Sequence, residues 1–91
     1  MEMIGVWLSV DEKRVVASLQ EAAEKLDTCQ GEVVLDCSSV RRIDASVLRA
    51  MECLVDEADR KGVKVVLSGL SVAVYKVLKL AKLASRFSFT N

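Results

Sequence analysis

The spacing of hydrophobic residues along the chain switches repeatedly between the period of a β-strand and that of an α-helix. Short apolar runs predict strands at residues 4–8, 32–37 and 63–68, and the second run indicates a buried strand with a partner on each side. The first run is mostly apolar, which favours a central place in the sheet. Phe87 and Phe89 alternate with polar residues and predict either a last short strand or an apolar flap.

Between these runs, apolar residues recur at the spacing of helices that are buried along one face. Ser9 and Glu12 form a capping-box pattern, so the first helix is predicted at residues 10–28. The second helix is predicted at residues 46–61, and the third follows Ser71, which is a suitable N-cap.

This alternation of strands and helices predicts one α/β domain over residues 1–91, with a mixed, mostly parallel sheet of about four strands and three helices. No linker, repeat or low-complexity tract interrupts the pattern. The predicted loops are short and leave little chain from which to build a pocket for a large cofactor. We therefore expect no cofactor.

The composition limits the partners that this domain can have. Thirteen basic residues balance thirteen acidic ones, so no overall field attracts nucleic acid or an anionic membrane. The beginning of the sequence has an acidic residue at position 2 and no long apolar segment, which matches neither a secretory signal nor a membrane span. A cytoplasmic location, without insertion into a membrane, is expected.

An enzyme or a metal site would need a nucleophile, a base or a set of ligands. The chain has no histidine, and Cys29, Cys37 and Cys53 lack metal-ligand spacing, so reduced structural thiols are predicted. Asp36 and Asp44 lie at the end of the second strand and in the loop after it, where two carboxylates could be neighbours and act as acid and base or bind Mg²⁺. A third ligand and a lysine are missing from the pattern, so we predict neither a catalytic nor a metal-binding residue.

Asp44, Ala45 and Ser46 stand at the predicted start of the second helix, where backbone N–H groups lack partners within the helix. A phosphate at this position would meet a favourable helix dipole. The alternative is that Ser46 or Asp44 caps the helix, which would contribute about 0.5–2 kcal/mol without any partner protein.

Three segments between residues 33 and 87 carry a recognisable set of motifs: V-V-L-D-C-S-S-V-R-R-I-D-A-S-V-L, K-G-V-K-V-V-L-S-G-L and V-Y-K-V-L-K-L-A-K-L. Together they resemble the STAS domain of bacterial anti-sigma factor antagonists, in which an L-D-L-S-x-V strand and turn lead to a D-S-S-G-L or D-T-S-G-L helix start. The matching positions here are Asp36, Ser38, Val40, Asp44, Ser46 and Leu48.

The resemblance implies a non-enzymatic regulatory module whose partner is an anti-sigma factor with a kinase-type ATPase domain. In the antagonist branch, that partner phosphorylates the hydroxyl residue two positions after the aspartate, which corresponds to Ser46. ATP and Mg²⁺ would belong to the partner. Other STAS domains imply an alternative, a subunit that scaffolds the ATPase of a phospholipid-transport ABC complex. A nucleotide-binding module is a third possibility, although the chain has no glycine-rich phosphate loop.

Two residues at this helix start depart from the family pattern, and one of them is Ala45, which replaces the first of the paired hydroxyl residues. Val47 stands where the family usually has glycine, and its β-branched side chain is predicted to narrow the approach to Ser46. Arg41 and Arg42 form either a solvated turn or a pair of cations for a phosphate or an acidic partner. The predicted partner-binding residues are Ser38, Arg41, Arg42, Asp44, Ala45, Ser46, Val47 and Arg49.

The third helix carries a band of cations, and the chain has two large aromatic residues outside its tail. The band comprises Lys76, Lys79, Lys82 and Arg86, and indicates either an exposed helix face favoured by the helix dipole or a surface for an acidic partner. Trp7 and Tyr75 are predicted at the edge of the core.

Overall fold

The computed structural model describes residues 5–28 and 31–90, so Ile4, the predicted start of the first strand, and Cys29 lie outside the described residues. Strands and helices alternate as predicted, with two short 3₁₀ turns added. In chain order the elements are β1 (Gly5–Ser9), α1 (Val15–Lys25), η1 (Leu26–Thr28), β2 (Glu32–Asp36), α2 (Ala45–Lys61), β3 (Lys64–Ser68), α3 (Val72–Leu80), η2 (Ala84–Arg86) and β4 (Ser88–Thr90).

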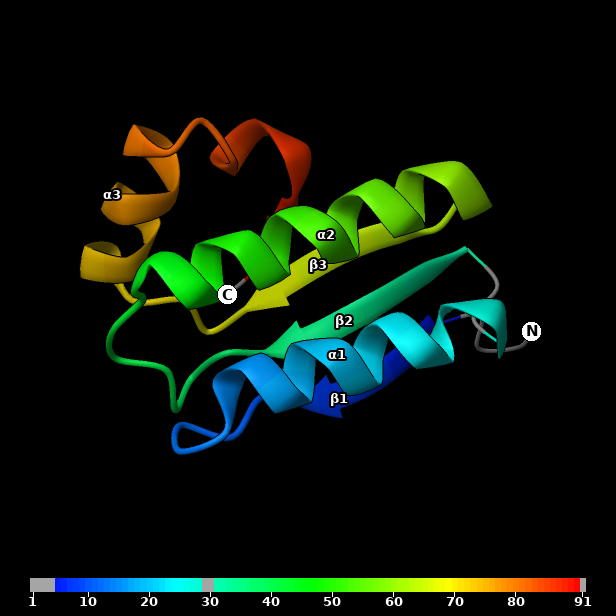
Figure 1. The fold of residues 1–91 in the computed structure, drawn as a ribbon, viewed down its shortest axis with the longest axis horizontal. Helices are drawn as coiled ribbons and strands as arrows, with labels where there is room; N and C mark the ends of the chain where they lie inside the picture. The colour runs from blue at the N-terminus through cyan, green and yellow to red at the C-terminus, as the bar shows by residue number, and fades with distance from the viewer. Residues whose placement is uncertain (1–4, 29–30, 91) are drawn as a thin grey trace.

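The four described strands form one parallel sheet in the order β1-β2-β3-β4. Each crossover therefore advances by one strand in the same direction, and Figure 1 shows α1 and α2 side by side over one face of the sheet. The predicted α/β class with four strands and three helices is confirmed. β2 lies between β1 and β3 as expected.

The predicted central place of the first strand is wrong, because the stepwise strand order leaves β1 at an edge of the described sheet. Leu8 packs against the core under the helices, but Trp7 is 61% exposed. In this parallel register Trp7 lies opposite Val34. Because successive residues of a strand point to opposite faces of the sheet, the side chain of Trp7 lies on the face away from Leu8 and the helices. The predicted place of Trp7 at the edge of the core is therefore wrong.

Alternation along the strands decides which side chains enter the core. Val33 and Leu35 of β2 belong to the core cluster together with Leu67 of β3, and all three are almost completely buried. The helices supply the opposite side of this core, for example Leu19 of α1 and Leu54 of α2. Because side chains alternate between faces, this arrangement places one apolar layer between the sheet and its helices.

The first helix begins later than predicted, at Val15. The backbone N–H of Val10 donates to the carbonyl oxygen of Asp36 at 3.0 Å, so the chain continues along the sheet beyond Ser9 instead of turning into a helix. The residue at the N-cap is Arg14, whose side chain makes no capping hydrogen bond. The capping box expected from Ser9 is therefore not formed, because Ser9 is the last residue of β1.

The ends of α2 and α3 follow the local signals in the sequence. Gly62 ends α2 in the left-handed conformation (φ 70°), which a residue without Cβ adopts at little cost. Ser71 caps α3, because its Oγ accepts a hydrogen bond from the backbone N–H of Val74 at 3.2 Å. None of the described helices is both long enough and apolar enough to cross a lipid bilayer.

Two members of the predicted cationic band lie outside the third helix, because α3 ends at Leu80 and both Lys82 and Arg86 follow it. Arg86 lies in η2, and its guanidinium donates to the carboxylates of Asp56 and Asp59 on α2 at 2.8 Å each. These hydrogen bonds, first to Asp56 and then to Asp59, raise the pKa of Arg86. Arg86 therefore joins the C-terminal segment to α2.

Tyr75 of α3 packs edge-on against Phe89 of β4 with ring centres 5.2 Å apart.

Candidate functional site

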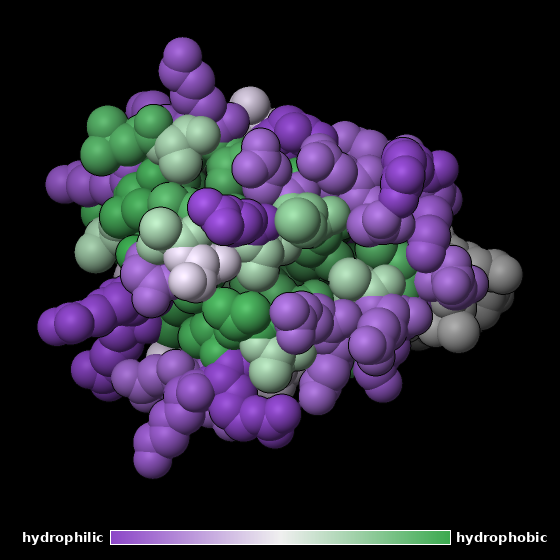
Figure 2. Space-filling model, viewed as in Figure 1, coloured by the Kyte–Doolittle hydropathy of each residue, from purple (hydrophilic) through white to green (hydrophobic). Residues whose placement is uncertain are grey.

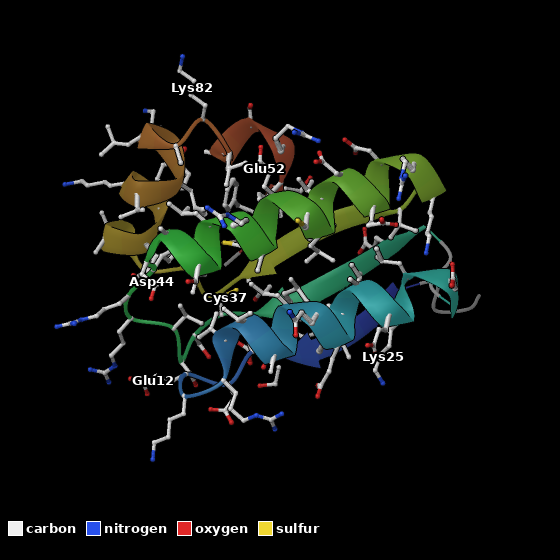
Figure 3. All side chains as sticks on the ribbon, viewed as in Figure 1. Glu12, Lys25, Cys37, Asp44, Glu52 and Lys82 are labelled. Atoms are coloured by element: carbon white, nitrogen blue, oxygen red, sulfur yellow. The ribbon has the colours of Figure 1, made fainter. Side chains whose placement is uncertain are left out.

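The carboxyl ends of the parallel strands and the start of α2 lie at the same end of the molecule (Figure 1). Open parallel sheets commonly present ligand-binding residues at this end. The loop of residues 37–44 connects β2 to α2 there. Figure 3 shows Asp44 at the start of α2 and Glu12 in the loop before α1 at this end, whereas Lys25 lies toward the opposite end. The predicted site residues therefore gather around one helix start.

The first part of this loop is held by local hydrogen bonds. The carboxylate of Asp36 accepts from the backbone N–H of Ser38 at 3.0 Å. Hydrogen bonds from the side chain and then the backbone of Ser38 lower the pKa of Asp36. Gly69, in the loop after β3, has φ 71°, and a Cβ built on it would lie 3.0 Å from the Cβ of Ser38. The two loops thus pack so closely that a side chain at residue 69 would push Ser38 aside by a few tenths of an ångström.

Asp44 is the N-cap of α2, and this frees Ser46 from that role. The Oδ1 atom of Asp44 accepts a hydrogen bond from the backbone N–H of Val47 at 3.0 Å. Ser46 is the second residue of the helix, and its side chain is exposed. Among the side-chain hydrogen bonds between described residues, none involves the hydroxyl of Ser46. The structure therefore leaves a solvent-facing hydroxyl in the first turn of α2.

Val47 differs from the other predicted partner-binding residues because its side chain is buried. It is 7% exposed and belongs to the core cluster, on the inner stripe of α2 that also contains Met51 and Leu54. The expectation that this side chain narrows the approach to Ser46 is therefore wrong, since consecutive helical residues point in directions about 100° apart. The other seven residues are exposed: Ser38, Arg41, Arg42, Asp44, Ala45, Ser46 and Arg49.

Ser46 opens onto an apolar groove between α1 and α2. The groove has a volume of about 320 Å³, and its α2 wall consists of residues at helical spacing that begin with Ser46 and Arg49. Figure 2 shows this groove as a hydrophobic band between two rows of polar residues. Its lining residues are Val16, Leu19, Gln20, Ala23, Ser46, Arg49, Ala50, Cys53, Leu54 and Glu57.

The groove and Cys53 were not predicted from the sequence. The signal that could have indicated them is the spacing of Ser46, Arg49, Ala50 and Cys53 along one side of the second helix. That spacing alone does not reveal that α1 forms the opposite wall.

Arg41 and Arg42 occupy the loop beside the start of α2 without lining this groove. Both arginines line a hollow with Ala73 and Val77 of α3, and Arg42 also shares a second hollow with Asp44 and the segment that leads into α1. The predicted residues therefore divide between the groove side of α2, with Ser46 and Arg49, and the loop side, with both arginines and Asp44.

The carboxylates considered for catalysis have structural roles. Asp36 accepts from the backbone of Ser38, and Asp44 accepts from the backbone of Val47. Within residues 5–28 and 31–90, no three His, Cys, Asp or Glu side chains are close enough to share a metal ion. Burial, with a smaller contribution from the charge of Asp36, raises the pKa of the Cys37 thiol to about 12. Cys37 is therefore protonated at neutral pH.

Comparisons with known proteins agree with this architecture. No match was found among curated proteins. The chain is similar to the protein TM1081, solved by NMR, with a TM-score of 0.79 and 17% identity over 100% of this chain and 77% of that one. It is also similar to a sulfate transporter family protein from Wolinella succinogenes, with a TM-score of 0.79 and 18% identity over 98% of this chain and 79% of that one. These identities support a shared fold only.

The family is shown by a separate match, to a model of the STAS domain. This match confirms the resemblance seen in the motifs of the second strand and the second helix. STAS domains are generally regulatory modules that act by binding other proteins. Since the match extends over residues 9–91, almost the whole chain, this protein belongs to the STAS domain family.

Proposed function

We propose that this protein is a non-enzymatic cytoplasmic module that binds an anti-sigma factor with a kinase-type ATPase domain and is switched by phosphorylation of Ser46. The observation that carries the proposal is the exposed hydroxyl of Ser46 in the first turn of α2, which remains unused because Asp44 caps the helix. A serine that capped its own helix would have to give up that hydrogen bond before it could be modified. Ser46 does not have this cost.

The proposed modification is a transfer of the γ-phosphoryl group of ATP bound to the partner. The Oγ atom of Ser46 attacks the γ-phosphorus, a new O–P bond forms, and the bond to the β-phosphate oxygen breaks to release ADP. The hydroxyl proton leaves to a base of the partner or to water. The product carries about −1.5 to −2 charge close to the positive end of the α2 dipole, which tolerates it.

Arg49 and the apolar groove explain how this charge would end binding. Arg49 lies three residues after Ser46 and lines the same groove, so it is placed to face the phosphate. A partner side chain that occupies the apolar groove next to Ser46 would have to bury the new charge, and an imperfectly paired buried charge costs several kcal/mol. The partner therefore dissociates although the fold of the module is unchanged.

The phosphorylation is tested by incubating the purified protein with the candidate anti-sigma kinase and ATP, and measuring its intact mass. We expect a mass gain of one phosphoryl group in the wild type and none in Ser46→Ala. Ser39→Ala is the matched control, because Ser39 is also an exposed serine at this end of the molecule. It should gain the same mass as the wild type. A phosphoryl group that persists in Ser46→Ala, or no gain in any protein, contradicts the proposal.

The consequence for binding is tested by titrating the partner with Ser46→Asp and with the wild type. Ser46→Asp should bind more weakly while its melting temperature stays close to that of the wild type. Equal binding of the two proteins would contradict a switch at the start of α2. Capture of an ABC-type ATPase by the unmodified chain, without any mass gain, would instead support the scaffold alternative.

A further inference from the structure

The solvent-facing side of α3 carries large apolar side chains between lysines. Val74 and Leu78 of this helix are buried in the core. On the opposite side, Val72 is 70% exposed and Leu80 is 85% exposed. Helical spacing places Lys76 between these two residues, with Lys79 beside it. We call Val72, Lys76, Lys79 and Leu80, with Lys82 in the following turn, the α3 outer face.

These lysines are not neutralised by the protein itself. Among the ion pairs between described residues, none involves Lys76, Lys79 or Lys82. Figure 3 shows Lys82 extending away from the molecule into solvent. Arg86 differs, because Asp56 and Asp59 of α2 pair with it. The α3 outer face therefore presents three exposed lysine charges that no acidic side chain among the described residues pairs with.

The surroundings of α3 strengthen this positive field. Residues 37–50 and 69–82 contain six of the thirteen basic residues of the chain but only one of the thirteen acidic residues, Asp44, which caps α2. The loop with Arg41 and Arg42 lies against the side of α3, where these arginines line a hollow with Ala73 and Val77. A chain with no net charge thus concentrates positive charge in these two segments, and the rest of the sequence is negative.

We propose that the α3 outer face is a docking surface for an acidic amphipathic segment of another protein. Carboxylates of such a segment complement the lysine charges, and its apolar residues cover the two exposed aliphatic side chains. This surface is separate from the hydroxyl of Ser46 and does not depend on its phosphorylation.

The spacing of the apolar residues favours a protein over a lipid bilayer. A helix that lies in a membrane surface needs a continuous apolar face, and α3 uses its continuous apolar face to pack against the core. Val72 and Leu80 are eight residues apart, about 12 Å along the helix, with a lysine between them. Nucleic acid is disfavoured as well, because its phosphates would leave both aliphatic side chains without an apolar partner.

Because α3 has only nine residues, the interface is small and the complex should be weak and transient. Exposed charge pairs are screened by salt, so binding should weaken strongly as the salt concentration rises.

The probe for the test is a fluorescently labelled helical peptide with alternating glutamate and leucine positions along one face. We expect fluorescence anisotropy to report binding at low salt, and a peptide with the same composition in scrambled order to bind much more weakly. In Lys76→Gln/Lys79→Gln/Lys82→Gln the affinity should fall about tenfold or more. Leu80→Gln, a change at a highly exposed site, should also weaken binding several-fold.

The matched control is Lys13→Gln/Lys25→Gln/Lys64→Gln, which removes the same charge elsewhere and should retain binding within about twofold of wild type. Ser46→Ala should also bind normally, so a failure of the phosphorylation proposal leaves this test intact. Equal loss in both lysine triples would mean that binding follows net charge alone and would overturn the proposal. Binding to vesicles of phosphatidylserine and phosphatidylcholine, or to duplex DNA, without binding to the helical peptide would overturn it too.

Discussion

The carboxylate of Asp44 accepts a hydrogen bond from the backbone N–H of Val47. This bond caps the start of α2, so the hydroxyl of Ser46, which lies between the two residues in sequence, is not needed as a cap. The side chain of Val47 turns inward to the core and that of Ser46 turns outward to the groove. Within one helical turn, Asp44 therefore caps the helix and Ser46 presents an exposed hydroxyl. Each can be tested on its own.

Replacing Asp44 with alanine should destabilise the protein by about 0.5–2 kcal/mol, because the N–H of Val47 loses its acceptor. Urea unfolding gives this difference directly. Asp44→Asn, which keeps an acceptor oxygen, should lose much less. Ser46→Ala is the second control and should leave the free energy of unfolding within about 0.5 kcal/mol of the wild type. A larger loss of unfolding free energy in Ser46→Ala than in Asp44→Ala would show that Ser46, and not Asp44, caps the helix.

Gly69→Ala and Gly62→Ala separate backbone strain from steric overlap. Both glycines have φ close to 70°, so either substitution should cost roughly 1–2 kcal/mol in the free energy of unfolding. A Cβ at Gly62 meets no atom within 4 Å, whereas one at Gly69 lies 3.0 Å from the Cβ of Ser38. Gly69→Ala should therefore be the more destabilising of the two.

An NMR comparison of the two glycine variants locates the effect. Gly69→Ala should shift the amide signals of the loop at Ser38, and Gly62→Ala should leave them unchanged. Equal stability of the two variants, with no shift in that loop, would argue against the close packing of the two loops.

Leu67→Ala should destabilise the protein by about 2–5 kcal/mol, because this side chain is fully buried in the layer between β3 and the helices. Leu80→Ala removes the same atoms from a side chain that is 85% exposed, and should change stability by less than about 0.5 kcal/mol. Chemical denaturation of both variants checks the difference. Similar losses of stability in the two variants would mean that α3 buries the face that carries Leu80.

The thiols of Cys37 and Cys53 should differ in reactivity toward iodoacetamide. Cys53 is exposed and should be alkylated in the folded protein, whereas Cys37 is buried, with a pKa raised to about 12, and should react only after unfolding. Mass spectrometry of peptides from native and urea-treated protein distinguishes the two. Native alkylation of Cys37 at the rate of Cys53 would contradict its burial.

The same pKa shift predicts a loss of stability at alkaline pH. In the unfolded chain a cysteine loses its proton near pH 8.5, well below the value of about 12 in the folded protein. Between these values unfolding releases a proton from Cys37, so the free energy of unfolding falls as the pH rises. The decline should be smaller in Cys37→Ala when both proteins are compared between about pH 8.5 and 10.5.

Much of the fold could be predicted from the sequence because its signals are local. The acceptor of the α3 cap, Ser71, is three residues from its donor, and Gly62 ends α2 through its own backbone conformation. The motif around Asp44 and Ser46 likewise lies within a few residues, so the candidate site was found without knowledge of tertiary contacts. The beginning of α1 was misplaced because Val10 bonds to Asp36 on a different strand, a contact that no local pattern contains.

The sequence by itself determined the order of strands and helices, the buried β2 strand and the hydroxyl at the start of α2, because hydrophobic period and capping act over one or two turns of chain. Only the tertiary structure decided that β1 lies at an edge, that α1 and α2 enclose an apolar groove beside Ser46, and that Arg86 pairs with Asp56 and Asp59. These features join residues far apart in sequence. Their energies depend on how whole elements pack, which local spacing does not encode.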